Sequence, residues 1–263
     1  MAGVIVERGT VWLVGAGPGD PGLLTVKATQ VLAQADVVLH DALVSPEILA
    51  LAPQAHLEPV GKRAGRERTP QMRINQRLID LARANLRVVR LKGGDPLVFG
   101  RGGEEALALA AAGISCQIVP GISAGIGAAA AAGIPVTHRG LAHSVAFVTG
   151  HDSSGGVPDL DWAALARGAD VLVLYMALRQ IGAIAAQLRA AGRAASEPVA
   201  FITEATTPRQ SVTVTTLADA ERIAAAIPRT APTLIVVGPV IALRPLLAGQ
   251  AIQSPPEKER HAA

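Results

Sequence analysis

Hydrophobic positions in the first half of the chain form short apolar runs, separated by segments in which apolar residues recur at helical spacing. The apolar runs predict strands at residues 11–14, 37–39, 56–60, 87–91 and 115–119. The helical spacing predicts helices at residues 23–33, from 46, 69–84, 104–112, and from 120 to about 133. Because strands and helices alternate with short connections, we expect a mainly parallel sheet covered by helices.

The alternation restarts near His138. Strands are predicted at residues 144–149, 171–175, 199–203, 211–215 and 233–237, and helices at 160–166, 178–191 and 217–226. Residues 211–215 alternate polar and apolar side chains, which favours an antiparallel strand. We therefore predict an α/β fold of two α/β domains with mainly parallel sheets, residues 1–138 and 139–246, and a cleft between them. A flexible polar tail is predicted at residues 247–263.

A glycine-rich stretch at residues 91–105 connects a predicted strand to a predicted helix. Gly93 and Gly94 permit backbone angles that other residues avoid, and they let a ligand approach the main chain. Asp95 follows at the carboxyl end of the strand, where open α/β sheets bind their ligands. An ordinary turn is the alternative, since the sequence Gly-Asp-Pro is also typical of turns.

The composition indicates a large aliphatic core, because 50% of the 263 residues are hydrophobic and only 2% are aromatic. No membrane-spanning run or apolar signal core is visible in the sequence. The single cysteine, Cys116, excludes a disulfide framework, suits a reducing cytoplasm and lies in an apolar run that favours an inert thiol. A net charge of +3 fits an anionic small molecule at least as well as nucleic acid, because six aromatic residues offer few platforms for stacked bases.

Several common chemistries lack their motifs. The segment from Gly15 to Asp20 begins like a dinucleotide-binding loop, but Asp20 stands where the third glycine is needed. The chain contains no phosphate-binding P-loop, no paired cysteines or His-Glu-x-x-His for a metal, and no Gly-x-Ser-x-Gly nucleophile. We therefore predict no metal site. Two glycine loops remain that have the shape of a ligand site.

These two loops, residues 15–25 and 91–105, carry a resemblance that extends over about residues 11–243. The chain resembles the tetrapyrrole methylases. The first loop is shared by the wider family, whereas the second is typical of the members that methylate uroporphyrinogen III. Further motifs of those members are matched by residues 61–65, 119–123, 133–139 and 148–151.

The resemblance implies an enzyme that uses S-adenosylmethionine to methylate uroporphyrinogen III at C2 and C7. The products would be precorrin-2, on the way to sirohaem and cobalamin, and S-adenosylhomocysteine. It also implies a homodimer in which the cofactor lies in the cleft between the two domains. From the single cysteine we expect the protein to be cytoplasmic. We expect no nucleic-acid partner and no membrane attachment.

Carried over residue by residue, the resemblance implies these cofactor contacts: Pro18, Gly93, Gly94, Asp95, Val98, Ser123, Ala124, Met176, Ala205, Pro232 and Thr233. Asp41 and Lys62 match positions proposed for proton transfer, and His40 departs from the tyrosine that relatives often have. Simpler alternatives are a turn residue for Asp41, a solvated lysine for Lys62 and a core residue for Met176. The substrate carries eight carboxylates, and the predicted partners for them are Arg63, Arg101 and Arg139.

Other functions stay open. A relative acting on a later corrin ring, on RNA or on a modified protein would share the first loop, and the basic loop after residue 60 motivates the RNA version. The RNA version is disfavoured by the motif at residues 91–105 and by the small number of aromatic residues. A non-catalytic binding protein is a further alternative, against which Asp41, Lys62 and Asp95 speak. Because only ten residues precede Val11, we expect methylation without dehydrogenase or ferrochelatase activity.

Overall fold

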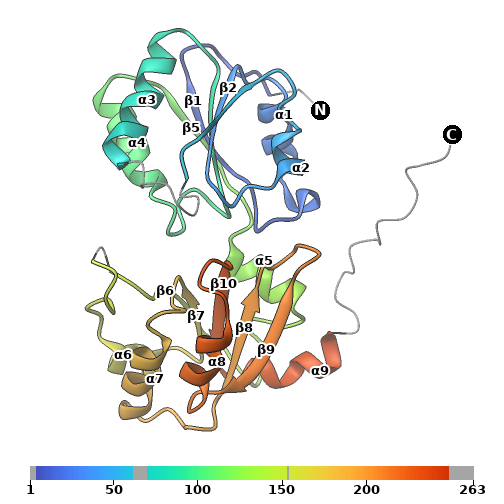
Figure 1. Cartoon of the computed structure of the whole chain (residues 1–263), viewed down its shortest axis with the longest axis vertical. Coiled ribbons are helices and arrows are strands. Elements are labelled where there is room, and N and C mark those ends of the chain that lie inside the picture. The colour runs from blue at the N-terminus through green and yellow to red at the C-terminus, as the bar shows by residue number, and fades with distance from the viewer. Residues whose placement is uncertain (1–3, 62–69, 153, 249–263) are drawn as a thin grey trace, which may run out of the picture.

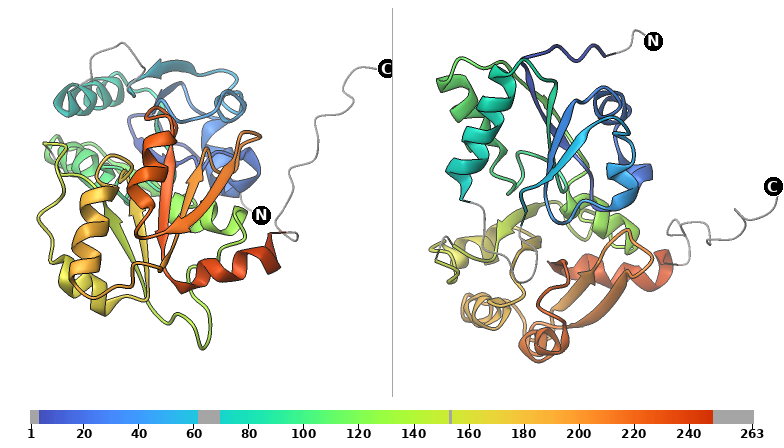
Figure 2. Two further views of the ribbon diagram at one scale, coloured as in Figure 1. Left: turned by 60° about the horizontal axis from the view of Figure 1, so that its bottom comes forward. Right: turned by 45° about the horizontal axis from the view of Figure 1, so that its top comes forward.

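The fold consists of two five-stranded sheets in separate layers, each with helices on both faces (Figures 1 and 2). It is seen in a computed structural model that describes residues 4–61, 70–152 and 154–248. The predicted α/β fold class is confirmed. The boundary between residues 138 and 139 stays a prediction, and the predicted tail lies outside the described residues from 249 onward.

The first sheet is parallel throughout, with the strand order β3-β2-β4-β1-β5. Helices α1 and α2 lie on one face, and α3 and α4 lie on the other (Figure 1). Successive residues of a strand point to opposite faces of the sheet, and each face carries one apolar cluster. Trp12 and Val14 lie in the cluster on one face, and Val11 and Leu13 lie in the cluster on the other. The bounds are β1 (Val11–Gly15), α1 (Val26–Leu32), β2 (Val37–His40), α2 (Pro46–Leu49), β3 (His56–Pro59), α3 (Gln71–Arg83), β4 (Val88–Lys92), α4 (Gly102–Ala111) and β5 (Cys116–Val119).

The strand order creates a switch point between β1 and β4, which are neighbours in the sheet. From β1 the chain passes through α1 to β2 on one side, whereas from β4 it passes through α4 to β5 on the other side. Because the two connections diverge, the carboxyl ends of β1 and β4 leave room between them. Open α/β sheets bind ligands at such a point.

The second sheet has the order β6-β7-β10-β8-β9 and is mixed, so the prediction of a mainly parallel sheet is wrong for this half. Only β6 and β7 pair in parallel, because β10 lies between β7 and β8 and runs against both. β9 pairs antiparallel with β8, as its alternating pattern predicted. The bounds are β6 (Val145–Thr149), β7 (Val171–Tyr175), β8 (Pro198–Thr203), β9 (Ser211–Thr216) and β10 (Thr233–Val237).

Helices also cover both faces of the second sheet (Figure 1). On one face lie α6 (Trp162–Gly168), α7 (Ile181–Ala190) and α8 (Ala220–Ala226). On the other lie α5 (Ala124–Ala131) and two elements that the sequence pattern did not predict, η2 (Pro239–Leu243) and α9 (Arg244–Leu247). Ala128 on α5 is fully buried against this sheet. No helix in the part of the chain that the structure describes is both long and apolar enough to cross a membrane.

Candidate functional site

The loops that follow β1, β4 and β5 meet at the switch point and form what we call the loop junction, residues 16–20, 93–101 and 120–123. Gly17 and Gly94 exchange two backbone hydrogen bonds, of 3.1 and 2.7 Å. A Cβ atom on Gly121 would lie only 2.3 Å from the carbonyl oxygen of Gly94, and one on Gly15 would lie 2.5 Å from the amide nitrogen of Gly121. Glycine is therefore required at these two positions for the backbones to approach each other.

Gly93 differs from the glycines that are packed against backbone. A Cβ atom on Gly93 would meet only the side chain of Leu43, at 3.8 Å. Gly94 has a positive φ of 67°, and its nearest neighbours would lie 3.7 Å away. The main chain of these two residues is therefore accessible at the switch point, and a ligand can approach it there.

Asp95 connects two loops of the junction through its carboxylate. Oδ1 accepts a hydrogen bond from the amide of Leu97 at 2.8 Å, and Oδ2 accepts one from the amide of Gly121 at 3.1 Å. The sequence pattern did not predict this role. The side chain is partly exposed and a carboxylate has further acceptor positions, so a cofactor contact by Asp95 stays compatible with these bonds.

Tyr175, at the end of β7, brings the second sheet to the loop junction. Its hydroxyl lies 2.6 Å from Ser123 Oγ and accepts a hydrogen bond of 2.6 Å from the amide of Gly125. Its ring lies 4.8 Å from that of Phe99, which belongs to the loop after β4. Burial raises the pKa of the Tyr175 phenol. The sequence pattern did not indicate a role for Tyr175, because a tyrosine that ends an apolar strand is also typical of an ordinary core.

The first glycine loop also contacts the second half of the chain. A Cβ atom on Gly127 of α5 would lie 2.8 Å from Pro18, and the amide of Asp20 donates to Thr206 Oγ1 at 3.1 Å. A Cβ atom on Gly19 would lie 3.2 Å from the carbonyl oxygen of Ala205. Pro18 therefore packs close to α5, and Ala205 lies beside the same glycine loop.

The loop after β8 adjoins the start of β10. The amide of Glu204 donates to the carbonyl oxygen of Pro232 at 2.8 Å, and the hydroxyls of Thr203 and Thr233 lie 3.4 Å apart. Ala205 is therefore close in space to Pro232 and Thr233. The predicted cofactor residues lie in these adjoining loops and at the first residues of α5 and β10. Which of them bind a cofactor stays a prediction.

Strained backbone is concentrated in these loops. Phe99, Met176 and Thr206 have φ values of 51°, 55° and 60°, in the left-handed region that costs a residue with a Cβ about 1 kcal/mol. Such residues persist where the surrounding structure over-determines them, and they cluster at binding sites. Met176 is also about half exposed. This exposure, unusual for a methionine directly after a buried strand, favours the ligand interpretation over that of a core residue.

Asp41 belongs to a group of charged side chains that we call the Arg90 network. Arg90 Nη2 lies 2.6 Å from Asp41 Oδ1, and Arg90 Nε lies 3.1 Å from Glu105 Oε1. Lys92 Nζ lies 3.1 Å from both oxygens of Glu105. Burial and the charge of Arg90 lower the pKa of Lys92. The sequence pattern did not indicate a role for Arg90, Lys92 or Glu105, because these residues lie in or directly after a predicted strand and at the start of a predicted helix.

His40 is buried beside Asp41, and its Nδ1 lies 3.1 Å from the carbonyl oxygen of Asp41. Gly61 packs on the same segment, since a Cβ atom there would lie 2.1 Å from the amide nitrogen of Ala42. Lys62, predicted for proton transfer, and Arg63, predicted for substrate binding, lie outside the described residues.

The two described arginines predicted for substrate binding are both exposed. Arg101 forms a two-pronged ion pair with Glu104, with distances of 2.8 and 2.7 Å, and has a positive φ of 59°. Arg139 lies in the segment between α5 and β6. Cys116 is partly buried, and burial raises the pKa of its thiol to about 11, which favours an inert residue. The described residues contain no group of three or more histidine, cysteine, aspartate or glutamate side chains that could hold a metal ion.

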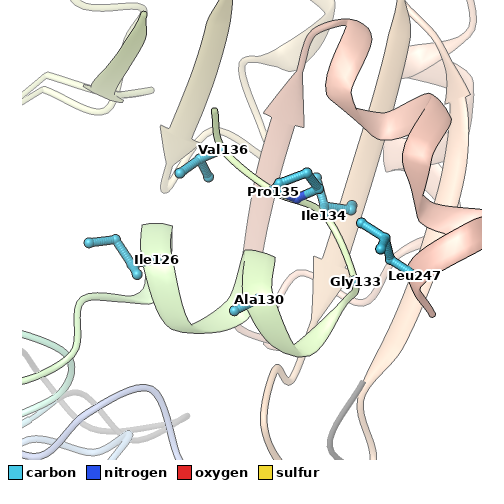
Figure 3. Close-up of a pocket in the computed structure, with 7 residues that line it drawn as sticks. All are labelled: Ile126, Ala130, Gly133, Ile134, Pro135, Val136 and Leu247. Carbon is cyan, nitrogen blue, oxygen red and sulfur yellow. The ribbon is translucent and has the colours of Figure 1, made fainter. Parts of the chain in front are cut away.

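Two of the cavities that the described residues form lie beside the second sheet. One of about 390 Å³ opens beside α5 and is lined by apolar side chains, among them Ile126, Ile134 and Leu247 (Figure 3). Its lining contains no charged side chain, so it shows no feature of a catalytic site. The other, of about 710 Å³, lies between β6 and α6, and Phe99 of the loop junction contributes to its lining.

The model of the Tetrapyrrole (Corrin/Porphyrin) Methylases matches residues 10–221. A uroporphyrinogen-III C-methyltransferase from Sinorhizobium sp. is 58% identical over 244 residues, which are 92% of this chain and 87% of that protein. A siroheme synthase from Pseudomonas fluorescens is 54% identical over 93% of this chain. This chain spans about half the length of that protein, 53%.

Solved structures show the same similarity. The uroporphyrin-III C-methyl transferase of Thermus thermophilus, complexed with S-adenyl homocysteine, has a TM-score of 0.78 and 42% identity, and the match covers 89% of this chain and 99% of that one. A cobalt precorrin-4 methyltransferase has a TM-score of 0.77 and 29% identity over 89% of this chain. The fold and these similarities together define a methyltransferase of the α/β class. The chain belongs to the tetrapyrrole methylase family, which confirms the resemblance and the prediction of an enzyme.

Proposed function

We propose that the chain is an S-adenosylmethionine-dependent methyltransferase that methylates uroporphyrinogen III at C2 and C7 and yields precorrin-2. The observation that carries this proposal is the 58% identity, over 92% of the chain, to a protein named for methyl transfer to uroporphyrinogen III. The geometry supports it, because loops of both sheets converge at the switch point of the first sheet. The siroheme synthases among the relatives make sirohaem synthesis one use of the product.

The proposed cofactor site is the loop junction with the adjoining loops of the second sheet. S-adenosylmethionine supplies an already activated methyl group when bound, so the protein has to position the reactants rather than provide a nucleophile. Gly93 and Gly94 offer accessible backbone, and Asp95 offers further acceptor positions. The remaining proposed contacts are Pro18, Val98, Ser123, Ala124, Met176, Ala205, Pro232 and Thr233.

Asp41 is the proposed proton acceptor, because a pyrrole N–H becomes acidic as the ring carbon gains the methyl group. Arg90 engages one oxygen of this carboxylate, and among the described residues the other oxygen accepts no hydrogen bond. We retain Lys62 for proton transfer and Arg63, Arg101 and Arg139 for the carboxylates of the substrate. Arginine suits this task because its planar fork binds a carboxylate with two parallel hydrogen bonds. The ion pair with Glu104 already holds Arg101 in its present orientation.

The proposal also includes a homodimer and a location in the cytoplasm. It includes no metal, no nucleic-acid partner and no contact with a membrane. The single cysteine and the family resemblance support it. Sedimentation equilibrium measures the assembly directly, and a mass equal to one chain at micromolar concentration would remove the homodimer.

The test of the proposed function is an anaerobic incubation with uroporphyrinogen III and S-adenosylmethionine that carries a labelled methyl group. We expect label in the tetrapyrrole fraction at a ratio of two per macrocycle, and none when the protein is omitted. Calorimetry with S-adenosylhomocysteine accompanies the assay. Binding of that molecule without label in the tetrapyrrole would exclude the proposed substrate, while absence of binding would exclude the proposed cofactor.

A further inference from the structure

The central strand of the first sheet, β4, carries two charged side chains where apolar ones would ordinarily pack. Arg90 and Lys92 point to the same face, and their side chains are only 4% and 2% exposed. The neighbouring inward positions on that face are apolar, for example Leu13 and Leu39. Burying charges is unfavourable unless they are paired and hydrogen-bonded, so a specific arrangement has to compensate for it here.

Glu105 compensates both cations. It lies in the first turn of α4, its side chain is fully buried, and the positive end of the helix dipole favours its negative charge. Oε1 accepts hydrogen bonds from Arg90, Lys92 and Gln71, at 3.1, 3.1 and 3.0 Å. Arg90, Lys92, Glu105 and Asp41 together carry no net charge. The side chain of Asp41, 31% exposed, is the one of these four that reaches solvent appreciably.

The guanidinium of Arg90 is held on several sides. Besides its bond to Glu105, Nη1 donates to the carbonyl oxygens of Leu91 and Leu39, at 3.3 and 3.5 Å. Its remaining nitrogen, Nη2, donates to Asp41 Oδ1 at 2.6 Å. Each of these contacts restricts rotation of the guanidinium, so the group presents a fixed donor to Asp41.

Asp41 is fixed at the end of β2 next to the glycine loop after β4. Its amide donates to the carbonyl oxygen of Leu91 at 3.1 Å, and Leu91 lies two residues before Gly93. Within the residues that the structure describes, its second oxygen, Oδ2, makes no hydrogen bond. One oxygen of the carboxylate is thus tied to the sheet, and the other is available beside the proposed cofactor loop.

We propose that Arg90, held by Glu105, is a positioning residue that orients Asp41 for proton transfer during methylation. This inference rests on the proposed function. As the new carbon–carbon bond forms and the carbon–sulfur bond of the cofactor breaks, the ring loses its N–H proton to Oδ2 of Asp41. The carboxylic acid then releases the proton to solvent. Arg90 keeps Oδ1 engaged throughout, so the proton is taken up by Oδ2.

A double-mutant cycle separates positioning from mere structural support. Arg90→Lys keeps the positive charge but cannot donate to Glu105 and Asp41 with one planar fork. We expect Arg90→Lys to lower kcat about tenfold, with KM and the affinity for S-adenosylhomocysteine changed less than about twofold. In the Asp41→Asn background the same substitution should change kcat by less than about twofold, because the group through which Arg90 acts is already impaired.

The matched control is Arg77→Lys, at an arginine that pairs with Glu58 through the same two-pronged geometry on the surface. It should leave kcat within about twofold of the wild type. If Arg90→Lys does not fold, Glu105→Gln tests the same support from the other side. We expect a drop in kcat of about threefold, again lost in the Asp41→Asn background.

The possible failures are distinguishable. If the fold-decreases in kcat caused by Arg90→Lys and by Asp41→Asn multiply in the double variant, the positioning role is overturned. The proposed methylation and the role of Asp41 would then still stand. An Asp41→Asn variant with full kcat would overturn both the role of Asp41 and this inference. A wild-type protein that produces no methylated tetrapyrrole would overturn the proposed function, and the inference with it.

Discussion

The carboxylate of Asp95 accepts backbone hydrogen bonds from Leu97 and Gly121, so a single side chain ties the loop after β4 to the loop after β5. The sequence alone predicts that Asp95 follows a strand, but it does not show which backbone amides will donate hydrogen bonds to its carboxylate. The partner Gly121 follows a different strand, and only the neighbouring positions of β1, β4 and β5 in the sheet bring it close.

The first prediction concerns Asp95→Asn, which replaces one acceptor oxygen by a donor that faces an N–H group. We expect the free energy of unfolding to fall by about 1 kcal/mol, the net contribution of a hydrogen bond lost at a partly exposed site. The affinity for S-adenosylhomocysteine, measured by calorimetry, should fall about tenfold. Asp159→Asn, at an exposed aspartate away from the junction, is the control. An unchanged affinity would remove Asp95 from the cofactor site.

Tyr175 gives a second prediction, because it is the only tyrosine of the chain and its phenol can be titrated by ultraviolet absorbance. Burial raises its pKa above the ordinary value of 10.0 in the folded protein. The unfolded chain therefore loses this proton at lower pH than the folded one, and stability should decline as pH rises above 10. We expect the native titration curve to lie at higher pH than the curve in denaturant. Coincident curves would show that the phenol is not buried as described.

At the scale of elements, the strands and helices of the first sheet could be predicted from hydrophobic periodicity to within a few residues. The direction of β10 could not, since strands buried on both faces have similar apolar runs whether their neighbours are parallel or antiparallel. The pairing of the two charged residues of β4 with α4 could not be predicted either. An apolar pattern interrupted by Arg90 and Lys92 does not reveal that Glu105 of α4 will lie between them.

A third prediction concerns the close approach of the glycine loops. Gly121→Ala would place a Cβ atom 2.3 Å from the carbonyl oxygen of Gly94, so the backbones have to move apart. We expect a loss of about 1–3 kcal/mol in the free energy of unfolding, as for other overpacked sites, and weaker binding of S-adenosylhomocysteine.

Gly103→Ala is the matched control for this substitution, because Gly103 lies in α4 and a Cβ atom there would meet nothing within 4 Å. Alanine in a helix should stabilise the protein by about 0.5–1 kcal/mol. Chemical denaturation measures both variants. A Gly121→Ala variant as stable as Gly103→Ala would show that the junction tolerates a wider spacing of its loops.

At the scale of the whole molecule, the two sheets contact each other through the loops that carry the proposed site. The ring of Phe99 packs against that of Tyr175, and the amide of Asp20 donates to Thr206. The sequence pattern predicted two α/β domains with a cleft between them, and the family resemblance implied that the cofactor lies in this cleft. It could not predict these contacts, because they join residues far apart in the chain. For the same reason the site residues came from the family resemblance rather than from periodicity.

The most direct test of this account is to follow ¹³C-methyl-labelled S-adenosylmethionine by NMR during anaerobic turnover with uroporphyrinogen III. We predict two new methyl signals in the tetrapyrrole, each on a carbon of a different pyrrole ring, and one S-adenosylhomocysteine released for each methyl group transferred. Label that remains in the cofactor, although S-adenosylhomocysteine binds the protein, would contradict the proposed function.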